Sequence, residues 1–532
     1  MNRSVERILV TLAASAVVAG LVLRLHGLDR KVWWPDEIAT WSELAGCTER
    51  DLWTFHDGRP HTVAERMRCQ RSHAAVNALD VARALVDQEP QNQPLYYVTA
   101  HAALRALDGW PWAPRLVSAI ASSLALAVAF FLGAELFGSW RAGAITAALV
   151  AVSPLHVRFA QEARVYSCWS LFTAASGWLL VRAYRRDRRR EWWLYAAAQA
   201  LACQSQLLSI PVALGQLAWG KIVSATPGEN LDPRCWRRHV VAVAAALATL
   251  LPWSIGVALH RDVAVRTLDW TAEPMPLANL VRRWLGIVTT IFVRTGADGG
   301  LLGAGTDLAT ETARLVLGLA ICVPVALAFA RLVRARPLRE WGFVVALGAP
   351  AFLALAIPDV LVGGRRSSMA RYLLPAWWAV ELVVAWAFAR ALQPRAHSSG
   401  VPRAALASFA TLIAAGTWVC VRGAALDVWW DTNPEVLHAL AAEAAPERSL
   451  AVDGVAALPE RPGYVLRDVP PYQVLAFARM LDPTTVLVVD GPPRAIPPDC
   501  VALSLFLVDL RAPSTQTYRC PAGAIEGSER AG

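Results

Sequence analysis

Two adjacent carboxylates stand in an aromatic segment near the start of the chain. Residues 33–37 read Trp-Trp-Pro-Asp-Glu and closely follow an apolar run over 8–25. Apolar rings beside a bilayer edge would partly desolvate these acids, which suits a general base. An interfacial anchor with solvated acids would explain the same residues. We take Asp36 as the candidate base and Glu37 as a candidate substrate-binding residue.

A second polar segment, 153–166, reads Ser-Pro-Leu-His-Val-Arg-Phe-Ala-Gln-Glu-Ala-Arg-Val-Tyr. Arg158 and Glu162 are four residues apart, so an ordinary helical ion pair would account for both. That interpretation leaves Arg164 and Tyr166 unexplained. Glu162, Arg164 and Tyr166 are therefore candidate substrate-binding residues.

A third segment, 363–372, reads Gly-Gly-Arg-Arg-Ser-Ser-Met-Ala-Arg-Tyr. A guanidinium group matches the oxygens of a phosphate with two parallel hydrogen bonds, so clustered arginines suit an anionic ligand. Contact with lipid headgroups is the alternative. The candidates here are Arg365, Arg366, Arg371 and Tyr372.

A fourth segment, 92–97, reads Asn-Gln-Pro-Leu-Tyr-Tyr. Proline in a first helical turn is ordinary and needs no functional reason. Two amides and two phenols beside it could bind a sugar. We therefore add Asn92, Gln93, Tyr96 and Tyr97 as weaker substrate-binding candidates.

Membrane helices are the elements that would position these segments. The 532 residues are 55% hydrophobic and 17% charged, with a mean hydropathy of +0.37. Soluble domains carry roughly 25% charged residues. Repeated apolar runs also match the length that a hydrocarbon slab of roughly 30 Å demands of a helix. The eleven expected spans are 8–25, 116–136, 141–156, 167–184, 191–206, 207–223, 240–259, 313–333, 341–358, 373–392 and 403–421.

The short stretch 94–107 decides the topology. It is apolar but only about 14 residues long, which is typical of an interfacial or re-entrant helix. If it does not span, the arginine-rich loops all fall on the side of the N-terminus, which the positive-inside rule assigns to the cytoplasm. We predict a cytoplasmic N-terminus and an extracytoplasmic C-terminus. The arginines of 363–372 then break the rule, which favours a bound anion there.

The predicted architecture is an all-α polytopic membrane module over 1–422 and a small extracytoplasmic α/β domain over 423–532. The first extracytoplasmic loop would cover 26–115. In the tail, strand-like runs over 449–452, 485–489 and 501–508 flank a helical stretch over 472–481.

Four cysteines lie in the parts predicted to be extracytoplasmic. An oxidising exterior would permit Cys47–Cys69 and Cys500–Cys520 disulfides, but spacing alone does not decide either pairing. No spacing of His and Cys is typical of a metal site. No metal or other cofactor is predicted, and a bound divalent cation stays an alternative that the sequence does not decide.

The four polar segments converge on one predicted side of the membrane. A base, phosphate-binding arginines and an apolar groove together suit a lipid-linked phosphosugar. A transporter or flippase of a lipid-linked or anionic substrate is the main alternative, but no internal repeat or midplane polar cluster is evident. A scaffold that presents 423–532 is a third. Nucleic acid is not an expected partner, because most arginines lie in short loops between apolar runs.

The motifs and their order resemble the GT-C glycosyltransferases, especially the bacterial branch similar to protein O-mannosyltransferases and the lipid A aminoarabinose transferase. The resemblance rests on the Asp-Glu pair, on Pro-Leu-Tyr-Tyr, on Ser-Pro…Gln-Glu-Ala-Arg-x-Tyr and on Arg-Tyr-Leu-Leu-Pro over 371–375. It covers 8–210 well and 340–422 through one motif. The family usually has His-Pro-Pro before Leu-Tyr-Tyr, whereas here Asn92 and Gln93 precede a single proline. This departure bears on donor or acceptor preference.

The resemblance implies an inverting transfer of a sugar from a polyprenyl-phosphate donor to an acceptor hydroxyl at the extracytoplasmic face. The acceptor would be a protein, a lipid or a glycan. The family's first acidic motif supplies the base, which corresponds to Asp36. Arginines of the later motifs steady the donor phosphate and correspond to Arg164 and Arg371. The arginine-rich, lysine-poor composition points to a multi-pass protein of a bacterial inner membrane.

Overall fold

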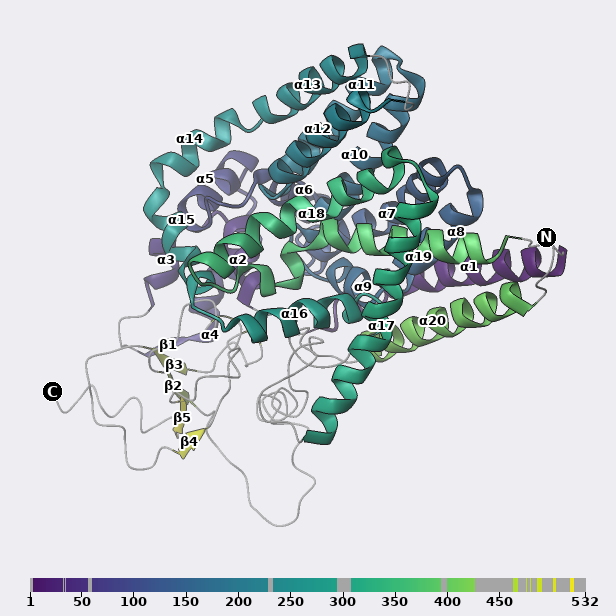
Figure 1. Ribbon diagram of the computed structural model, residues 1–532. Helices are drawn as coiled ribbons and strands as arrows, with labels where there is room; N and C mark the ends of the chain where they lie inside the picture. Colours follow the sequence, from purple (N-terminus) through teal and green to yellow (C-terminus); the bar gives the residue numbers. More distant parts are fainter. Residues whose placement is uncertain are drawn as a thin grey trace, which may run out of the picture. The chain divides into compact units, whose positions relative to one another are not determined.

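Figure 1 shows the helices and strands of a computed structural model of the chain. Its residues divide into two compact units. The described residues are 3–31, 33, 35–55, 60–227, 233–293, 308–393, 400–425, 463–466, 475, 479, 486–489, 501–503 and 517–520. The first compact unit, which we call the helical unit, comprises Met1–Leu28, Glu89–Thr99 and Pro114–Ala425. We call the second the loop unit; it comprises Asp29–Gln88, Ala100–Ala113 and Leu426–Gly532. The division predicted from sequence, at residue 422, stays a prediction.

Each of the eleven predicted spans coincides with a helix or with a bent pair of helices. The helices of the helical unit are α1 (Arg3–Leu25), α7 (Ala113–Phe137), α8 (Trp140–Ala151), α9 (Pro154–Ala160), α10 (Tyr166–Arg186), α11 (Arg189–Cys203), α12 (Ser209–Ala225), α13 (Pro233–Ala248), α14 (Leu251–Leu259), α15 (Arg261–Leu268), α16 (Leu277–Thr290), α17 (Leu308–Ala335), α18 (Leu338–Leu361), α19 (Leu374–Ala391) and α20 (Gly400–Ala425). The short helix α6 (Pro94–Ala106) matches the predicted stretch 94–107.

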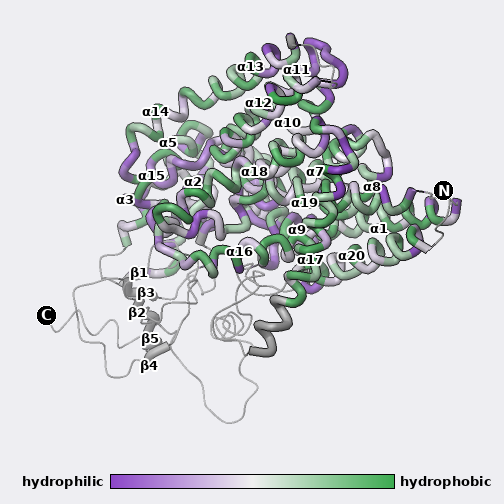
Figure 2. Tube along the Cα trace, viewed as in Figure 1, coloured by the Kyte–Doolittle hydropathy of each residue, from purple (hydrophilic) through white to green (hydrophobic). Residues whose placement is uncertain are grey.

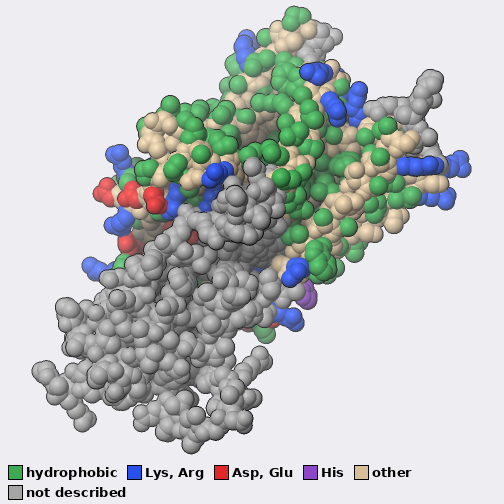
Figure 3. All heavy atoms as spheres, turned by 60° about the horizontal axis from the view of Figure 1, so that its bottom comes forward, with side chains coloured by type: hydrophobic (Ala, Val, Ile, Leu, Met, Phe, Trp, Pro, Cys, Tyr) green, Lys and Arg blue, Asp and Glu red, His purple; other side chains and the backbone are tan. Residues whose placement is uncertain are grey.

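Several helices are suited to a membrane by length and composition. Among the described residues, five single helices qualify, and the number rises to seven if each of two bent pairs is one span. Hydrophobic residues run along these helices and hydrophilic ones gather at their ends (Figure 2). In the space-filling view, hydrophobic side chains cover the helix flanks while lysines and arginines sit at the edges (Figure 3). The chain is therefore a multi-pass membrane protein.

The predicted span 141–156 is broken into α8 and α9, which meet at an angle of 60°. Pro154 cannot donate a backbone hydrogen bond, so the last carbonyls of α8 need another donor. The buried guanidinium of Arg24 supplies it, donating to Ala151 O at 2.7 Å and Val150 O at 2.8 Å. Its Nε also donates to Ser122 Oγ at 2.9 Å. A cation at a helix C-terminus is favourable, so Arg24 stabilises the break.

Short elements make up the loop unit. Its helices are α2 (Pro35–Leu44), α3 (Glu49–Trp53), α4 (Val63–Arg66) and α5 (Ala78–Gln88). In α5 the residues Val81, Ala84, Leu85 and Gln88 are buried, which is the i, i+3, i+4, i+7 spacing of an amphipathic helix. Both α3 and α4 begin with a capping box, in which a threonine and an acid three residues later satisfy each other's backbone N–H groups.

A five-stranded sheet joins the first loop to the tail, in the order β1-β3-β2-β5-β4. The strands are β1 (Pro60–Thr62), β2 (Gly463–Leu466), β3 (Val486–Val489), β4 (Val501–Leu503) and β5 (Thr517–Cys520). The β1–β3 pair is antiparallel, with His61 opposite Leu487, and β2 runs parallel to β3. The predicted runs over 485–489 and 501–508 contain β3 and β4, and the run over 449–452 lies outside the described residues.

The disulfide that the sequence left open in the first loop is present. Cys47 and Cys69 are bonded, with their Cα atoms 5.8 Å apart. Cys500 lies outside the described residues, so the second pairing stays a prediction. The helices of the loop unit are too short to be stable alone, so a covalent cross-link helps to stabilise the folded unit.

Candidate active site

The turn between α9 and α10 carries Glu162 and Arg164, and it is fixed to the end of α1. Gln161 ends α9, and its side-chain Nε2 donates to Leu23 O at 2.7 Å and His26 O at 3.0 Å. Gln161, Glu162 and Arg164 are all buried. The backbone that presents the Arg164 guanidinium is therefore anchored at a defined place in the helical unit.

Arg164 meets residues of the fourth predicted segment through Glu89. Its Nη1 lies 3.1 Å from Glu89 Oε2, and that oxygen also accepts a hydrogen bond of 2.7 Å from Asn92 Nδ2. Asn92 Nδ2 lies 3.1 Å from the hydroxyl of Tyr97. The side chain of Arg164 is 5% exposed and that of Glu89 is 18% exposed. We call Glu89, Asn92, Tyr97 and Arg164 the Glu89 cluster.

Sequence reasoning missed Glu89. It stands three residues before Asn92, in a segment chosen for its amides and phenols rather than its acids. An acid directly before a predicted binding motif was a usable signal. Its pairing with Arg164 was not visible in the sequence, because 75 positions separate the two residues.

Other residues of the fourth segment have different surroundings. Tyr96 is fully buried and its hydroxyl donates to Pro114 O at 3.0 Å, which ties α6 to the start of α7. Gln93 Nε2 donates to Gln91 O at 2.9 Å. Gln93 Oε1 is buried and has no hydrogen-bond partner among the described residues. Tyr96 therefore has a structural contact, whereas the side-chain oxygen of Gln93 is a candidate hydrogen-bond acceptor for a ligand.

Other residues of the second segment contact one another. Arg158 Nε, in α9, and Glu162 Oε1, in the turn that follows, are 3.4 Å apart and form the expected i,i+4 ion pair. Tyr166 begins α10 and is buried edge-to-face against Phe159, with ring centroids 5.1 Å apart. These contacts stiffen the turn on either side of Arg164.

Two arginines of the third segment have carboxylate partners. Arg365 Nη1 lies 2.9 Å from Glu273 Oε2, and Arg366 Nη1 lies 3.0 Å from Asp359 Oδ1. The other Asp359 oxygen accepts hydrogen bonds from the backbone N–H and the hydroxyl of Ser367, at 2.6 and 2.7 Å. These pairs fold the segment against α18 and the stretch before α16. They also give carboxylate partners to two of the three arginines in this segment.

Trp270 contacts two arginines of this segment. The Arg365 guanidinium carbon lies 5.3 Å from the centre of the Trp270 ring, and that of Arg371 lies 5.5 Å from it. Arg371 also lies 5.3 Å from the ring of Tyr372. Cation–π contacts hold a guanidinium in place while leaving its N–H donors able to bind an anion. Arg371 is thus held beside two aromatic rings and stays a candidate for binding an anion.

The carboxylates Asp36 and Glu37 lie in the first turn of α2, in the loop unit. A helix N-terminus is a favourable position for an acidic side chain. Asp36 is partly exposed, whereas Glu37 is fully buried. A base that must meet an incoming hydroxyl needs such exposure, so Asp36 is the better candidate of the pair.

The carboxylates do not gather into a metal-binding group. Within the described parts of the chain, no three His, Cys, Asp or Glu side chains come together as they would around a metal ion. The cation beside Glu89 is the guanidinium of Arg164.

Comparison with known proteins supports a relationship to glycosyltransferases. A family model described as dolichyl-phosphate-mannose-protein mannosyltransferase matches residues 94–255, a range that includes the turn bearing Glu162 and Arg164. No curated protein sequence matches the chain significantly.

Two solved membrane proteins share the fold. ArnT from Cupriavidus metallidurans, solved with undecaprenyl phosphate, superposes with a TM-score of 0.54 and 12% sequence identity over 97% of this chain and 98% of that one. The archaeal oligosaccharyltransferase AglB from Archaeoglobus fulgidus, solved with an inhibitory peptide and a dolichol-phosphate, gives a TM-score of 0.51 and 12% identity. That match covers 91% of this chain but 64% of AglB. The chain therefore shares the fold of these two proteins, and its residues 94–255 are similar to the mannosyltransferase family.

Proposed function

We propose that the enzyme transfers a sugar from a polyprenyl-phosphate-linked donor to an acceptor hydroxyl at the extracytoplasmic face of a bacterial inner membrane. Three findings support this donor class. ArnT was solved with undecaprenyl phosphate, AglB was solved with a dolichol-phosphate, and the matched family model is named for dolichyl-phosphate-mannose. The predicted topology, with a cytoplasmic N-terminus, supports the choice of face.

The proposed chemistry is one displacement with inversion at the anomeric carbon. The Asp36 carboxylate takes the proton of the acceptor hydroxyl, whose oxygen forms the new bond to the anomeric carbon. The bond from that carbon to the phosphate oxygen breaks, and polyprenyl phosphate leaves with the electron pair. A monophosphate leaving group gains one negative charge, which arginine can neutralise without a metal.

The Glu89 cluster carries the proposal. It brings a buried arginine together with an acid, an amide and a phenol from two separate motifs. Such a group can hold an anion and the hydroxyls of a sugar side by side. We assign Arg164 to the donor phosphate and Asn92, Gln93 and Tyr97 to the sugar.

The third segment supplies further cationic groups. We assign Arg371 to the donor phosphate or the first units of the lipid, with Tyr372 beside it. Arg365 and Arg366 hold this segment through Glu273 and Asp359 and add positive potential. The other candidates support these groups: Glu37, Glu162, Tyr96 and Tyr166.

Donor consumption tests this proposal. The purified protein is incubated with a panel of polyprenyl-phosphate monosaccharides and a membrane extract as acceptor, and released polyprenyl phosphate is measured by mass spectrometry. We expect release from one donor or a narrow set, which would also name the sugar. A folded protein that consumes no donor of the panel, and that instead moves a lipid-linked substrate across a vesicle membrane, would contradict a transferase of this class.

A further inference from the structure

An arginine of the C-terminal tail contacts two tryptophans at helix α2, whose first turn holds Asp36 and Glu37. The guanidinium carbon of Arg479 lies 4.5 Å from the centre of the Trp33 ring and 5.1 Å from that of Trp41. The two indoles meet edge-to-face, with centroids 6.0 Å apart. Trp33 stands three residues before Asp36, and Trp41 lies within the same helix. The cation therefore contacts the chain on both sides of Asp36.

The same tail segment also supplies an apolar anchor. The backbone N–H of Arg479 donates to Leu475 O at 3.1 Å, so the two residues are one helical turn apart. Leu475 is buried in a small core with residues of the first loop. The loop residues of this core are Ile38, Ala45, Cys47, Leu52 and Cys69, with Trp33 and Met67 packed against them.

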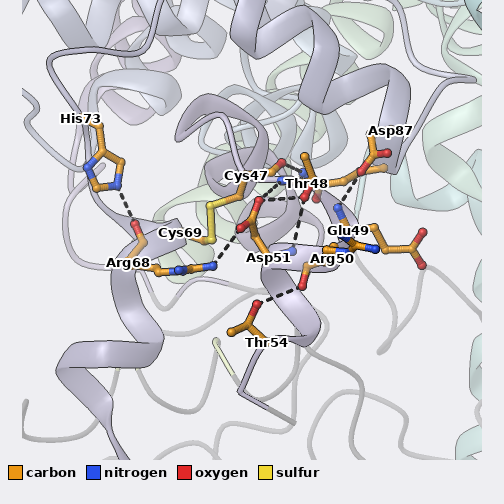
Figure 4. Close-up of polar contacts among 11 residues, drawn as sticks. Cys47, Thr48, Glu49, Arg50, Asp51, Thr54, Arg68, Cys69, His73 and Asp87 are labelled. Carbon is orange, nitrogen blue, oxygen red and sulfur yellow. Dashed lines mark hydrogen bonds and ion pairs between the residues drawn. A yellow bond between two sulfur atoms is a disulfide. The ribbon is translucent and has the colours of Figure 1, made fainter. Parts of the chain in front are cut away.

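A second set of contacts to α2 comes from Gln70. Gln70 Nε2 donates to Ile38 O at 3.1 Å and to Ser42 Oγ at 2.9 Å. Arg479 Nη2 donates to Gln70 O at 3.3 Å, so the tail arginine joins this set. Gln70 follows Cys69, which the disulfide joins to Cys47 just beyond the end of α2 (Figure 4).

We propose that Arg479 is a positioning residue that fixes the direction in which Asp36 is presented, and that the tail thereby forms part of the catalytic machinery. The inference rests on the proposed function for the role of Asp36. A cation between two indoles restrains both rings, and restraining Trp33 restrains the chain that enters α2. Gln70 holds α2 at Ile38 and Ser42, and the disulfide holds the chain just beyond its C-terminal end. Arg479 itself touches no reacting atom in this scheme.

Preorganisation explains why such a restraint matters. Catalysis by a general base requires its oxygen within hydrogen-bond reach of the proton, and a misplacement of about 1 Å can cost on the order of a hundredfold in rate. Loss of Arg479 would leave the charge of Asp36 unchanged and its direction less defined. The expected effect is therefore on kcat, with little change in the KM for the donor.

The test compares Arg479→Ala, Arg479→Lys and Arg83→Ala in the full-length protein. Arg83 is a matched control, because it lies in the same unit with a 70% exposed side chain and, among the described residues, forms its ion pair with Asp80 three residues away. Hydrogen–deuterium exchange of the α2 amides is measured in each variant, together with kcat and KM. Arg479→Lys keeps a cation over the rings but loses the guanidinium fork.

We expect Arg479→Ala to speed exchange in α2 and to lower kcat about tenfold to a hundredfold, with an unchanged KM for the donor. Arg479→Lys should recover part of both losses, and Arg83→Ala should match the wild type. Unchanged α2 exchange and unchanged kcat in Arg479→Ala would overturn the proposal. So would a general rise in exchange across the loop unit that Arg479→Lys does not reduce, because that pattern indicates folding rather than positioning.

The exchange measurement needs no turnover, so it separates this inference from the proposed function. If Asp36→Asn stays fully active, the role of Asp36 fails. If, in addition, Arg479→Ala leaves α2 exchange unchanged, the positioning role proposed for Arg479 fails independently.

Discussion

The Glu89 cluster and the α2 helix are held in place by different physical means. Arg164 lies in a turn anchored to α1 among helices of up to 28 residues. Asp36 opens a helix of 10 residues whose neighbours α3, α4 and α5 have 5, 4 and 11. Isolated helices of that length are marginal in water, so the loop unit depends on a disulfide, capping boxes and the Arg479 contact.

The difference implies that proton removal by Asp36 and phosphate binding by Arg164 can be weakened separately. Reduction should act on α2 and acid on the capped helices α3 and α4, and both should spare the Glu89 cluster. Substitutions within the helical unit should impair donor phosphate binding and spare α2. The following predictions test that separation.

The largest expected effect is that of reducing the Cys47–Cys69 bridge. The bond closes a loop of 22 residues, for which the chain-entropy relation gives about 3 kcal/mol. We expect reduction to abolish most turnover and to speed exchange in α2, while exchange in α7 and α18 is unchanged. Mass spectrometry would verify that the bridge is open. Full activity of the reduced protein would show that the bridge does not support the site.

Arg164→Gln should come next. Removing a donor aimed at a developing negative charge typically costs about a hundredfold or more in rate. We expect that loss in kcat/KM for the donor, with α2 exchange unchanged. Arg182→Gln is the matched control, because Arg182 lies in α10, the helix that follows the Arg164 turn, and is also ion-paired, to Glu191 at 2.8 Å. Equal losses in the two variants would indicate destabilisation of the bundle rather than loss of phosphate binding.

Glu89→Gln should have a smaller effect. The amide can still accept a hydrogen bond from Asn92, but it no longer neutralises Arg164. We expect about a tenfold fall in kcat/KM, roughly 1.4 kcal/mol, because a charge-assisted contact that orients Arg164 is weakened. Isothermal titration with polyprenyl phosphate would show whether phosphate affinity changes. An activity equal to that of wild type would limit Glu89 to a structural role.

The smallest expected effect is that of Thr48→Ala, at the capping box of α3 (Figure 4). Loss of an N-cap side chain typically costs about 1 kcal/mol. Partial burial alone would raise the pKa of Asp51, but hydrogen bonds from Thr48 and the charge of Arg68 outweigh it and lower that pKa. Hydrogen bonds from Thr62 likewise lower the pKa of Glu65.

The sign of the pH dependence follows from these lowered pKa values. Each acid stabilises the folded loop unit fully above its unfolded pKa of about 4, and the contribution is lost as the pH falls through the lower folded value. Exchange in α3 and α4 should therefore rise in acid in the wild type, and less so for α3 in Thr48→Ala. A pH-independent exchange rate, after correction for intrinsic rates, would contradict this assignment.

Local patterns in the sequence predicted the helices. Apolar runs of sufficient length located all eleven segments, and the short length of 94–107 set α6 apart from them. The break in the third span was not predicted, although Pro154 marks its place. The reason is that its stabilisation comes from Arg24, more than 120 residues away in the sequence.

Contacts between distant residues set the limits of the site prediction. The acidic pair, the Arg164 turn and the Asn92 segment could be chosen from residue types alone. The pairing of Arg164 with Glu89 and of Arg365 with Glu273 could not be predicted, because these partners are far apart in the sequence. The same holds for β1, whose pairing with β3 joins the first loop to the tail.

The most direct test of the account is a comparison of wild type with Asp36→Asn under single-turnover conditions, with donor binding measured in parallel. The amide keeps the shape of the side chain but cannot take a proton. We predict that donor affinity and α2 exchange stay as in wild type, while the rate of polyprenyl phosphate release falls by about a thousandfold. Release at the wild-type rate from Asp36→Asn would contradict the assignment of Asp36 as the base.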